Sequence, residues 1–497
     1  SVKVFNRSVH ETRVQELARD VGLVIQDPEA QMLSLLVEDD VAFGPENLGL
    51  SPKAIYQSVE ESLKLVGCEH LRNILTTRLS SGQKQRVAIA SAFSMGVRMI
   101  VLDEPFSNVD PFTAAHIAKE LADSAKKTGL TVVLVEHRLT TVAKYADRII
   151  AMNRGKITGD GHPSSVLYKE NLNAALRRPA LVELFRRFPG LGTPLTVEEA
   201  QQCILQSTRK VPAKKRNALQ NQNLADQVIE VKSVDFGYNA EILALKGISL
   251  AVRCGQLVSI MGANGAGKTT LLKLLAGLLK PTAGIVEVLG MKSQSLSDRQ
   301  LSSRLSIVFQ TPIHYFFNDS VENELRVTLK AVAPHLNTKA RIEEVLCDFS
   351  LEELRHRNPY SLSMGQMKRL TIAMALSYDP DIVTLDEPTV GQDADFRDWL
   401  SARLRRLKAR GKTVIVSTHD VEFATLTDRV VVLDKGQIVK DDEPRSVFYE
   451  LPMEKFGLQS PEIVQLFSCI GDVDNWNRPL TPNEAMEVLS SVVLHSK

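Results

Sequence analysis

Short runs of apolar and β-branched residues recur along the chain, separated by longer stretches in which apolar and polar residues mix. Within each run the residues do not alternate with polar ones, which favours strands buried on both faces of a parallel sheet. Longer stretches between the runs, such as 396–409, predict helices. The alternation of strand and helix predicts an α/β fold with ligands at the carboxyl ends of the strands. The runs are Val21–Gln26, Met99–Leu102, Thr131–Val135, Leu257–Met261, Leu305–Phe309, Ile382–Leu385 and Thr413–Ser417.

Most of this pattern occurs twice. The run Leu79–Gln83 (LSSGQ) recurs 283 residues later as Leu362–Gln366 (LSMGQ), and an Asp-Glu-Pro sequence repeats at the same offset. The turn sequences Asn153–Lys156 and Asp434–Gln437 predict one hairpin in each copy. The chain is therefore predicted to hold two copies of one domain, as its 497 residues allow.

A polar, basic segment at 207–228 separates the copies and is predicted to be a linker. Its charge also allows binding to a membrane surface or to RNA, but a solvated connector is favoured. The first domain then covers 1–206 and the second 229–497, each with a C-terminal extension. Apolar residues at helical spacing in both extensions predict helices, and packing on their own domain is the simpler of two interpretations.

The glycine-rich run Gly262–Thr269 (GANGAGKT) lies between the strand Leu257–Met261 and an apolar helix. Glycines let successive N–H groups point at a phosphate, the helix N-terminus adds partial positive charge, and Lys268 adds a full one. This loop predicts a site for a nucleoside triphosphate. Its candidate binding residues are Gly262, Ala263, Asn264, Gly265, Ala266, Gly267, Lys268, Thr269 and Thr270.

The offset between the copies places the matching loop of the first copy before Ser1. Two explanations remain open: the sequence begins inside the first copy, or the first copy lacks a phosphate loop. We expect the former, because the first copy keeps Asp103, Glu104 and His137. These groups would have no chemical task in a lobe that binds no nucleotide.

Composition narrows the function classes. A formal net charge of +1 gives no electrostatic case for a nucleic acid partner. The five cysteines lie far apart without a CxxC spacing, which indicates neither a disulfide framework nor a zinc site. No apolar stretch approaches the roughly 20 residues that span a bilayer, so any membrane role is expected to be peripheral.

Two acidic residues follow the predicted strand Ile382–Leu385. Phosphoryl transfer depends on positioning and charge neutralisation, and Asp386 stands where a carboxylate can reach a metal ion. We expect Thr269 to place its hydroxyl on Mg²⁺ and Glu387 to be the general base for an attacking water. The alternative is a pair of carboxylates that only caps the next helix.

Taken in order, the glycine loop, Gln310, LSMGQ, Asp386–Glu387 and His419 resemble the nucleotide-binding domain of ATP-binding cassette (ABC) proteins. The match covers nearly the whole chain. The resemblance implies two tandem ABC-type P-loop ATPase domains, the first lacking its N-terminal phosphate-loop portion. It also implies that the chain hydrolyses ATP with Mg²⁺.

The same resemblance assigns further roles. It implies that His419 contacts the γ-phosphate and the attacking water, that Gln310 touches Mg²⁺ and links the site to a membrane partner, and that Tyr238 stacks on adenine. A structural histidine, a polar loop residue and a surface or core tyrosine are the alternatives. The expected metal ligands are then Thr269, Gln310 and Asp386.

The LSSGQ run makes chemical sense only across an interface, where a hydroxyl and a helix N-terminus can reach a phosphate held by the opposite domain. The resemblance implies a head-to-tail sandwich in which Ser80, Gly82 and Gln83 complete the site of Lys268. In the other copy Met364 stands where the family usually has glycine, so we expect the second site to be weaker.

The runs Val37–Gly44 and Asp386–Asp393, with the extensions around Pro194 and Pro479, are similar to the ATPases of energy-coupling-factor (ECF) transporters. Those transporters import vitamins or transition-metal ions. The resemblance implies an ATPase bound peripherally at the cytoplasmic face of the cell membrane, which closes its lobes around ATP to drive integral membrane subunits: a transmembrane coupling protein and a substrate-binding subunit. The alternative is a soluble tandem ABC ATPase acting on ribosomes or DNA, which would usually carry a long charged helical linker or coiled-coil heptads.

Overall fold

The computed structural model describes residues 2–107, 109–170, 176–207, 226–239, 243–293, 298–470 and 477–493. The chain divides into two compact units, Ser1–Cys203 and Ile204–Lys497, and each is described by itself. Most of the predicted linker, 207–228, lies outside the described residues. No helix in the part of the chain that the structure describes is long and apolar enough to cross a membrane.

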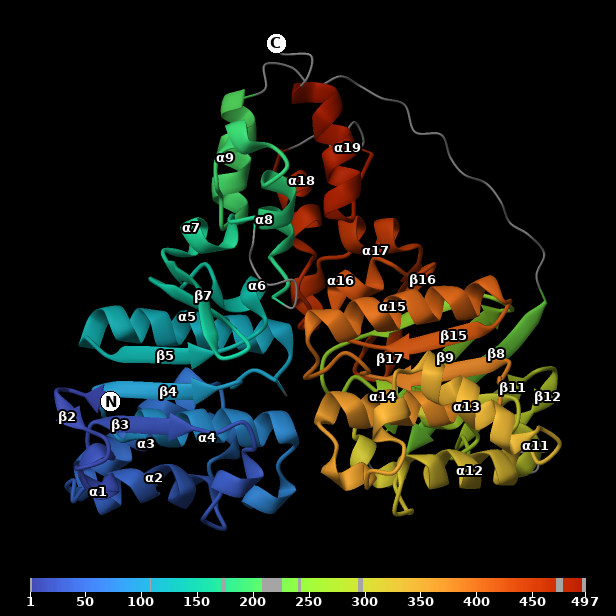
Figure 1. The fold of residues 1–497 in the computed structure, drawn as a ribbon, viewed down its shortest axis with the longest axis horizontal. Helices are drawn as coiled ribbons and strands as arrows, with labels where there is room; N and C mark the ends of the chain where they lie inside the picture. The colour runs from blue at the N-terminus through green and yellow to red at the C-terminus, as the bar shows by residue number, and fades with distance from the viewer. Residues whose placement is uncertain are drawn as a thin grey trace. The chain divides into compact units, whose positions relative to one another are not determined.

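The second unit is built on a six-stranded sheet in the order β13-β14-β15-β10-β16-β17. Figure 1 labels three of its strands, β15, β16 and β17. The first five strands are parallel and β17 is antiparallel to β16. Every residue of β10, β14 and β15 is buried, as the unbroken apolar runs predict. The bounds are β10 Leu257–Met261, β13 Leu305–Val308, β14 Ile382–Asp386, β15 Thr413–Ser417, β16 Arg429–Asp434 and β17 Gln437–Asp442.

A second, antiparallel sheet in the same unit has the strand order β12-β11-β8-β9. It carries one side of a buried cluster that also includes side chains of α10 and of the main sheet. The sequence patterns used above did not predict this sheet, because its strands alternate buried and exposed residues. The bounds are β8 Gln227–Gly237, β9 Leu243–Arg253, β11 Ala283–Val288 and β12 Met291–Lys292.

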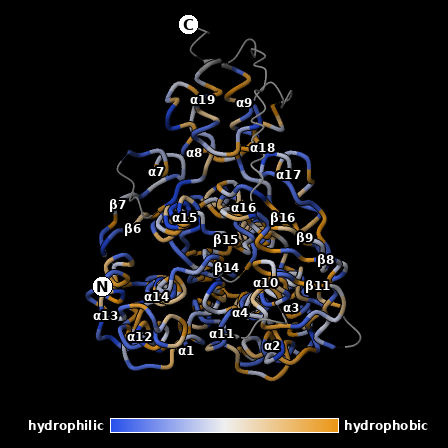
Figure 2. Tube along the Cα trace, turned by 90° about the vertical axis from the view of Figure 1, so that its right-hand side faces the viewer, coloured by the Kyte–Doolittle hydropathy of each residue, from blue (hydrophilic) through white to orange (hydrophobic). Residues whose placement is uncertain are grey.

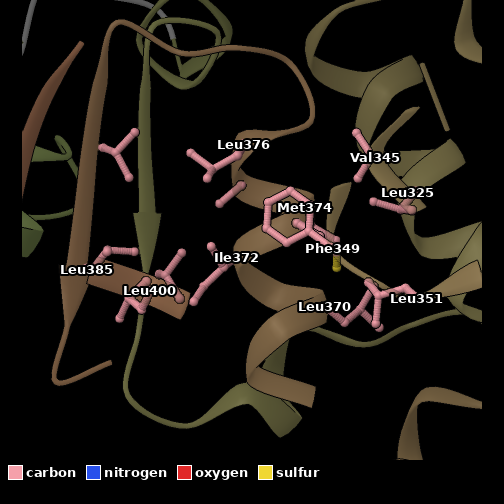
Figure 3. Close-up of a cluster of buried hydrophobic side chains, with 14 of the residues drawn as sticks. Leu325, Val345, Phe349, Leu351, Leu370, Ile372, Met374, Leu376, Leu385 and Leu400 are labelled. Carbon is pink, nitrogen blue, oxygen red and sulfur yellow. The ribbon is translucent and has the colours of Figure 1, made fainter. Parts of the chain in front are cut away.

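Helices cover the other face of the main sheet. Figure 3 shows Leu370, Ile372 and Met374 of α14 in one apolar cluster with Leu385 of β14 and Leu325 of α12. Figure 2 shows hydrophilic and hydrophobic residues mixed along α15, as expected for a helix with one buried stripe. The helices of this unit are α10 Lys268–Leu275, α11 Asp298–Ser302, α12 Val321–Val332, α13 Thr338–Asp348, α14 Met364–Leu376, α15 Ala394–Ala409, α16 Val421–Ala424, α17 Pro444–Glu450, α18 Glu462–Ile470 and α19 Pro482–Val493.

The first unit repeats part of this plan. Strands β3, β4 and β5 form a parallel sheet in that order, and β6 and β7 form a separate hairpin. The strands are β1 Lys3–Val4, β2 Arg7–Ser8, β3 Val21–Val24, β4 Met99–Asp103, β5 Thr131–Val135, β6 Ile149–Asn153 and β7 Lys156–Gly161. The helices are α1 Val14–Leu17, α2 Val37–Asn47, α3 Pro52–Leu65, α4 Ser81–Ser94, α5 Pro111–Thr128, α6 Leu139–Val142, α7 Pro163–Leu167, α8 Ala180–Phe185 and α9 Val197–Ser207.

The prediction that β5 is buried on both faces is wrong. Its residues alternate between exposed and partly exposed, and Val133 and Val135 are 41% and 52% exposed. Within the described residues β5 pairs only with β4, whereas the corresponding β15 also pairs with β10. In the second unit, β10, α10 and the second sheet surround β15. The described part of the first unit has no elements that correspond to these, so β5 stays partly exposed.

The C-terminal extension of the second unit packs on its own domain. Val447 of α17, Val464 of α18 and Leu480 form one buried cluster with Met261 and Val430 of the main sheet. This extension therefore packs on its own domain, and the cluster links it to the strand that precedes the glycine loop. The other interpretation, which the family resemblance implies, is that the extensions hold the two lobes together, and it stays a prediction.

Candidate active site

At two of the three glycines of the glycine loop, neighbouring atoms leave no room for a side chain. A Cβ atom on Gly262 would lie 2.5 Å from the carbonyl oxygen of Leu433, and one on Gly267 would lie 2.9 Å from that of Ala244. Gly267 also has φ +106°, which disfavours any other residue. A Cβ atom on Gly265 would meet nothing within 4 Å, so the loop keeps open space at this point. The loop thus forms a cradle that fits a phosphate group.

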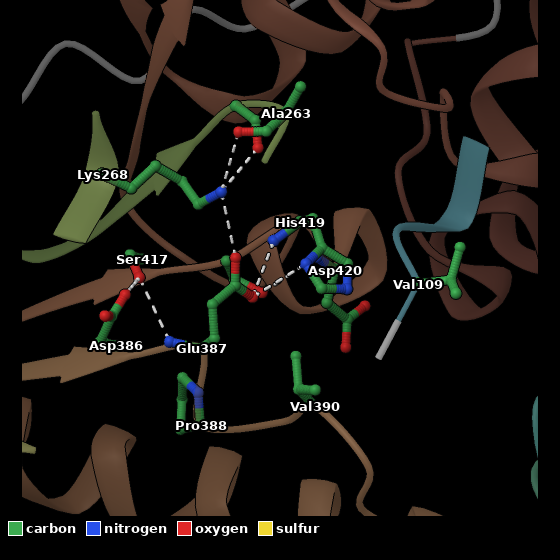
Figure 4. A network of polar contacts seen from close by, with 12 residues as sticks. Val109, Ala263, Lys268, Asp386, Glu387, Pro388, Val390, Ser417, His419 and Asp420 are labelled. Carbon is green, nitrogen blue, oxygen red and sulfur yellow. Dashed lines mark hydrogen bonds and ion pairs between the residues drawn. The ribbon is translucent and has the colours of Figure 1, made fainter. Parts of the chain in front are cut away.

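Lys268 begins α10 and holds its ammonium over this loop (Figure 4). The side chain is 6% exposed. Its Nζ donates to the carbonyl oxygens of Gly262 at 2.8 Å and Ala263 at 3.3 Å, and lies 3.2 Å from Oε1 of Glu387. Pairing and hydrogen bonds of this kind offset the cost of burying an ammonium group. The loop and the acidic pair therefore meet through Lys268.

Asp386 ends β14 and is 3% exposed. Thr269 donates its hydroxyl to Oδ2 at 2.6 Å, and the Ser417 hydroxyl donates to Oδ1. Burial raises the pKa of Asp386, and the two hydroxyl groups act against that rise. A carboxylate beside a hydroxyl offers the oxygen ligands that Mg²⁺ prefers, and Mg²⁺ usually takes only one or two carboxylates. The donor set fits that ion, and the described residues hold no larger acidic or histidine cluster that could bind a metal.

Glu387, the second carboxylate of the site, is also buried, at 5% exposure. Its φ of 48° is left-handed, and its N–H donates to the carbonyl oxygen of Ser417 at 3.0 Å. Oε2 lies 3.0 Å from Nδ1 of His419 and accepts from its backbone N–H at 3.3 Å. Burial raises the pKa of Glu387, but His419 and Lys268 together have the larger effect and lower the pKa to about 2. The carboxylate is ionised at neutral pH and can accept a proton.

The structure brings together Lys268, Thr269, Asp386, Glu387 and His419. Gln310, by contrast, is exposed after β13, and no hydrogen bond to its side chain is present in the described part of the chain. Its predicted contact with a metal ion stays a prediction.

Tyr238 lies beside the helix that follows the glycine loop. Its hydroxyl is 3.2 Å from the Thr270 hydroxyl, and its ring packs edge-on against Phe236. The ring is 63% exposed and is free to take a stacking partner. The position is compatible with the predicted adenine contact, which stays a prediction.

Each of the two LSxGQ runs begins a helix. The Ser80 hydroxyl accepts from the Gln83 N–H at 3.3 Å, and the Gln83 side chain accepts from the Ser80 N–H at 2.9 Å. Ser363 and Gln366 form the same capping box at the start of α14. Met364 is 55% exposed at the first position of that helix. Their roles towards a phosphate on the opposite domain, including that of Gly82, stay predictions.

Sequence reasoning missed Ser417. Its hydroxyl donates to Asp386 and accepts from the Glu387 N–H at 3.2 Å, so it fixes both acidic residues. A comparison of the two copies could have found it. The first copy has the apolar Val135 at the corresponding strand end, so a hydroxyl group at Ser417 stands out as a residue with a further role.

Comparison with known proteins places this site in a family. The sequence profile of the ABC transporter family matches residues 1–107 and 245–390. A "Putative ABC transporter ATP-binding protein" of Methanosarcina mazei is 35% identical over 489 residues, which cover 95% of this chain and 83% of that protein. The chain belongs to the ABC transporter family.

Further ABC proteins resemble the chain. The "Putative HMP/thiamine import ATP-binding protein YkoD" of Bacillus subtilis is 32% identical over 453 residues, covering 90% of this chain and 81% of that protein. The solved structure of cbiO1 from Clostridium perfringens, part of the ABC transporter complex cbiONQ, is 29% identical, with a TM-score of 0.41. It covers 47% of this chain and 98% of that one.

Family membership confirms several predictions together. The protein is an ABC ATPase of the transporter type, with an α/β fold and two ABC regions, and it uses ATP with Mg²⁺. Bound Mg²⁺ neutralises negative charge on the phosphate oxygens. Lys268 supplies positive charge next to the loop, Thr269 and Asp386 supply oxygen ligands, and Glu387 supplies an ionised carboxylate.

Proposed function

We propose that the protein is the energy-coupling ATPase of an ECF-type importer for a vitamin or a transition-metal ion. The similarity over 90% of the chain to a B. subtilis protein named for HMP/thiamine import supports this proposal. So does the resemblance of Val37–Gly44 and Asp386–Asp393 to ECF ATPases. In this proposal the domains are 1–206 and 229–497, joined by the linker 207–228.

Glu387 is the general base of the proposed reaction. Its carboxylate lies between His419 and Lys268, which hold its pKa well below the ordinary value. Lys268 also donates to carbonyl oxygens of the glycine loop, so its ammonium lies beside the place where we propose that the phosphates bind. His419 lies beside Oε2 and orients the carboxylate.

The observation that carries the membrane role is a pair of exposed apolar residues at matching positions. Leu33 is 67% exposed in the first unit, and Phe317 is 88% exposed in the second. Leu33 lies a few residues after Gln26, which follows β3. Phe317 lies a few residues after Gln310, which follows β13. Single exposed apolar residues are common on protein surfaces. The support here comes from their recurrence at equivalent positions of the two units.

Both of these apolar residues are held by a buried carboxylate. Asp40 accepts from the N–H groups of Leu33 at 2.8 Å and Ser34 at 2.9 Å. Glu324 accepts from those of Phe317 at 2.5 Å and Asn318 at 2.6 Å. Asp40 is 6% exposed and Glu324 2%. The loops are therefore preorganised to present their apolar residues, which fits docking of an apolar segment of a membrane protein.

Copurification from detergent-solubilised membranes tests this proposal. We expect small integral membrane proteins to remain bound to the purified chain. Changing both Leu33→Ser and Phe317→Ser should release them while ATP turnover persists. Copurification of ribosomal RNA in place of membrane proteins, or retention of membrane proteins by the double variant, would contradict the proposal.

A further inference from the structure

A lysine that the proposed chemistry does not use is buried behind the acidic pair. Lys368 lies on α14 and is 7% exposed. Its Nζ donates to the carbonyl oxygens of Val390 at 2.5 Å and Pro388 at 3.4 Å. Among the described residues no carboxylate forms an ion pair with it, and burial lowers its pKa to about 8. Burying an ammonium group costs free energy, so the position calls for an explanation.

The two carbonyl groups belong to the turn that begins with Glu387. The left-handed φ of 48° at Glu387 is strained for a residue with a side chain, and such strain persists only where neighbours hold it. On its N-terminal side, Ser417 bonds the Glu387 N–H. On its C-terminal side, Lys368 bonds Pro388 and Val390, the first and third residues after Glu387. Lys368 thus fastens this turn to α14.

The first unit has the same turn without this fastening. Glu104 has φ 45°, and its N–H donates to the carbonyl oxygen of Val135 at 2.9 Å. The residue that corresponds to Lys368 is Gln85, which is 0% exposed. Neither polar atom of its side chain has a hydrogen-bond partner within the described part of the chain. The left-handed φ itself therefore needs no lysine, and what distinguishes the turn that carries Glu387 is its attachment to α14 through Lys368.

We propose that Lys368 is a positioning residue for ATP hydrolysis: it holds the turn Glu387–Val390 on α14 and so fixes the Glu387 carboxylate for its reaction. The inference rests on the proposed role of Glu387 as the base, and it is independent of the transported cargo. Lys368 touches neither nucleotide nor metal in this role. It acts through the backbone of the two residues that it bonds.

Replacing Lys368 with the residue of the first unit tests the inference. Lys368→Gln should lower kcat for Mg·ATP hydrolysis by about 10- to 100-fold, because a displacement of about 1 Å at a reacting group costs that much. The KM for ATP should change by less than about 3-fold, because no ATP-binding contact is removed. Lys368→Met, which keeps length and apolar volume but no donor, should give the same split.

Lys412→Gln is the matched control. Lys412 also donates to a backbone carbonyl, that of Asp379 at 2.9 Å, and its side chain is 16% exposed. It lies after α15, outside the proposed chemistry. We expect its kcat to stay within about 2-fold of the unchanged protein, as for most substitutions away from a site. A loss of kcat as large as that of Lys368→Gln would overturn the inference.

A double-mutant cycle separates positioning from general stabilisation. In a Glu387→Gln background, Lys368→Gln should change residual turnover by less than about 2-fold, because the group that it positions is gone. An equal factor in both backgrounds, or full kcat in Lys368→Gln alone, would overturn the inference. Full turnover in Glu387→Gln alone would remove the base assignment itself, and the positioning role with it.

Discussion

The two acidic turns of this chain share one backbone conformation and differ in the burial and in the charged partners of their glutamates. Glu104 and Glu387 both have a left-handed φ, at 45° and 48°, and both follow a parallel strand. The Glu104 side chain is 28% exposed, accepts from Gln26 at 2.9 Å and lies 3.8 Å from His137. Glu387 is buried between Lys268 and His419. The local Asp-Glu-Pro sequence therefore goes with the turn, while the surrounding elements set its electrostatics.

The strands beneath these turns explain the difference. In the second unit β10 pairs with β15 and leads into the loop that carries Lys268. In the first unit β5 pairs only with β4 among the described residues, and Asp103 at the end of β4 is exposed. The carboxylate of Glu387, the proposed base, thus depends on a strand that is distant in sequence, because the loop after that strand carries Lys268.

The largest expected effect comes from the acidic residues themselves. Glu387→Gln should lower ATP turnover by about 10²- to 10⁴-fold with ATP binding retained, since it removes the proposed base. Glu104→Gln should cost far less, because the described part of its unit brings no lysine to the carboxylate. Steady-state hydrolysis and nucleotide binding of both variants check this. Equal losses of turnover would break the comparison.

The next effect concerns the strand end behind the acidic pair. Ser417→Val gives the second unit the residue that the first has at Val135 and removes two hydrogen bonds of a fully buried hydroxyl. Loss of such bonds leaves buried groups unsatisfied and should lower the free energy of unfolding by about 1–3 kcal/mol. Turnover should fall by about 10-fold or more, because both Asp386 and Glu387 lose a fixed neighbour. Denaturant unfolding and steady-state ATP hydrolysis measure the two effects. Unchanged stability and unchanged turnover in Ser417→Val would contradict the role of Ser417.

The loops at Leu33 and Phe317 should lose stability alike when their buried carboxylates are removed, because both units hold the loop by the same hydrogen bonds. Glu324→Ala and Asp40→Ala each remove a buried carboxylate that accepts two backbone N–H bonds. Each should lower the free energy of unfolding by about 1–3 kcal/mol. Denaturant unfolding of both variants measures this. A large loss for one and none for the other would show that only one loop is preorganised.

The smallest effect is a dependence of stability on pH. Lys268 and His419 lower the pKa of Glu387 from its ordinary value of 4.5 to about 2. The carboxylate therefore contributes stability above its unfolded pKa, and this contribution is lost as the pH falls through the folded value. As the pH falls from about 5 towards 3, the Tm of the unchanged protein should therefore fall by more than the Tm of Glu387→Gln. Glu104→Gln should show a smaller shift, and a larger one would contradict the assignment.

The sequence predicted the parts of the fold that depend on local patterns. Unbroken apolar runs located β10, β14 and β15, and the turn sequences located both hairpins. The second sheet of the second unit was not predicted, because its strands alternate and face one core. The exposure of β5 was not predicted either, since Thr131–Val135 has the composition of a buried strand and its exposure depends on which strands pair with it.

For the candidate site, residue identity was predictable and contacts were not. The loop and the Asp-Glu pair are contiguous motifs that can be recognised along the chain. Family membership shows an ATPase, and the roles of these residues in it stay predictions. The fixing of Asp386 by Ser417 and the burial of Lys368 depend on which helices and strands pack together. No spacing rule within one segment reports such contacts.

The resemblance to ABC proteins predicts that the signature run Leu79–Gln83 takes part in hydrolysis of the ATP that we propose binds at Lys268. ATP turnover of Gly82→Asp against Gly365→Asp tests this prediction most directly. A carboxylate in the first run should repel the phosphates and abolish turnover, whereas Gly365→Asp alters the run that the prediction does not assign to this ATP and should leave most of the turnover. Full turnover in Gly82→Asp, with loss in Gly365→Asp, would contradict the prediction.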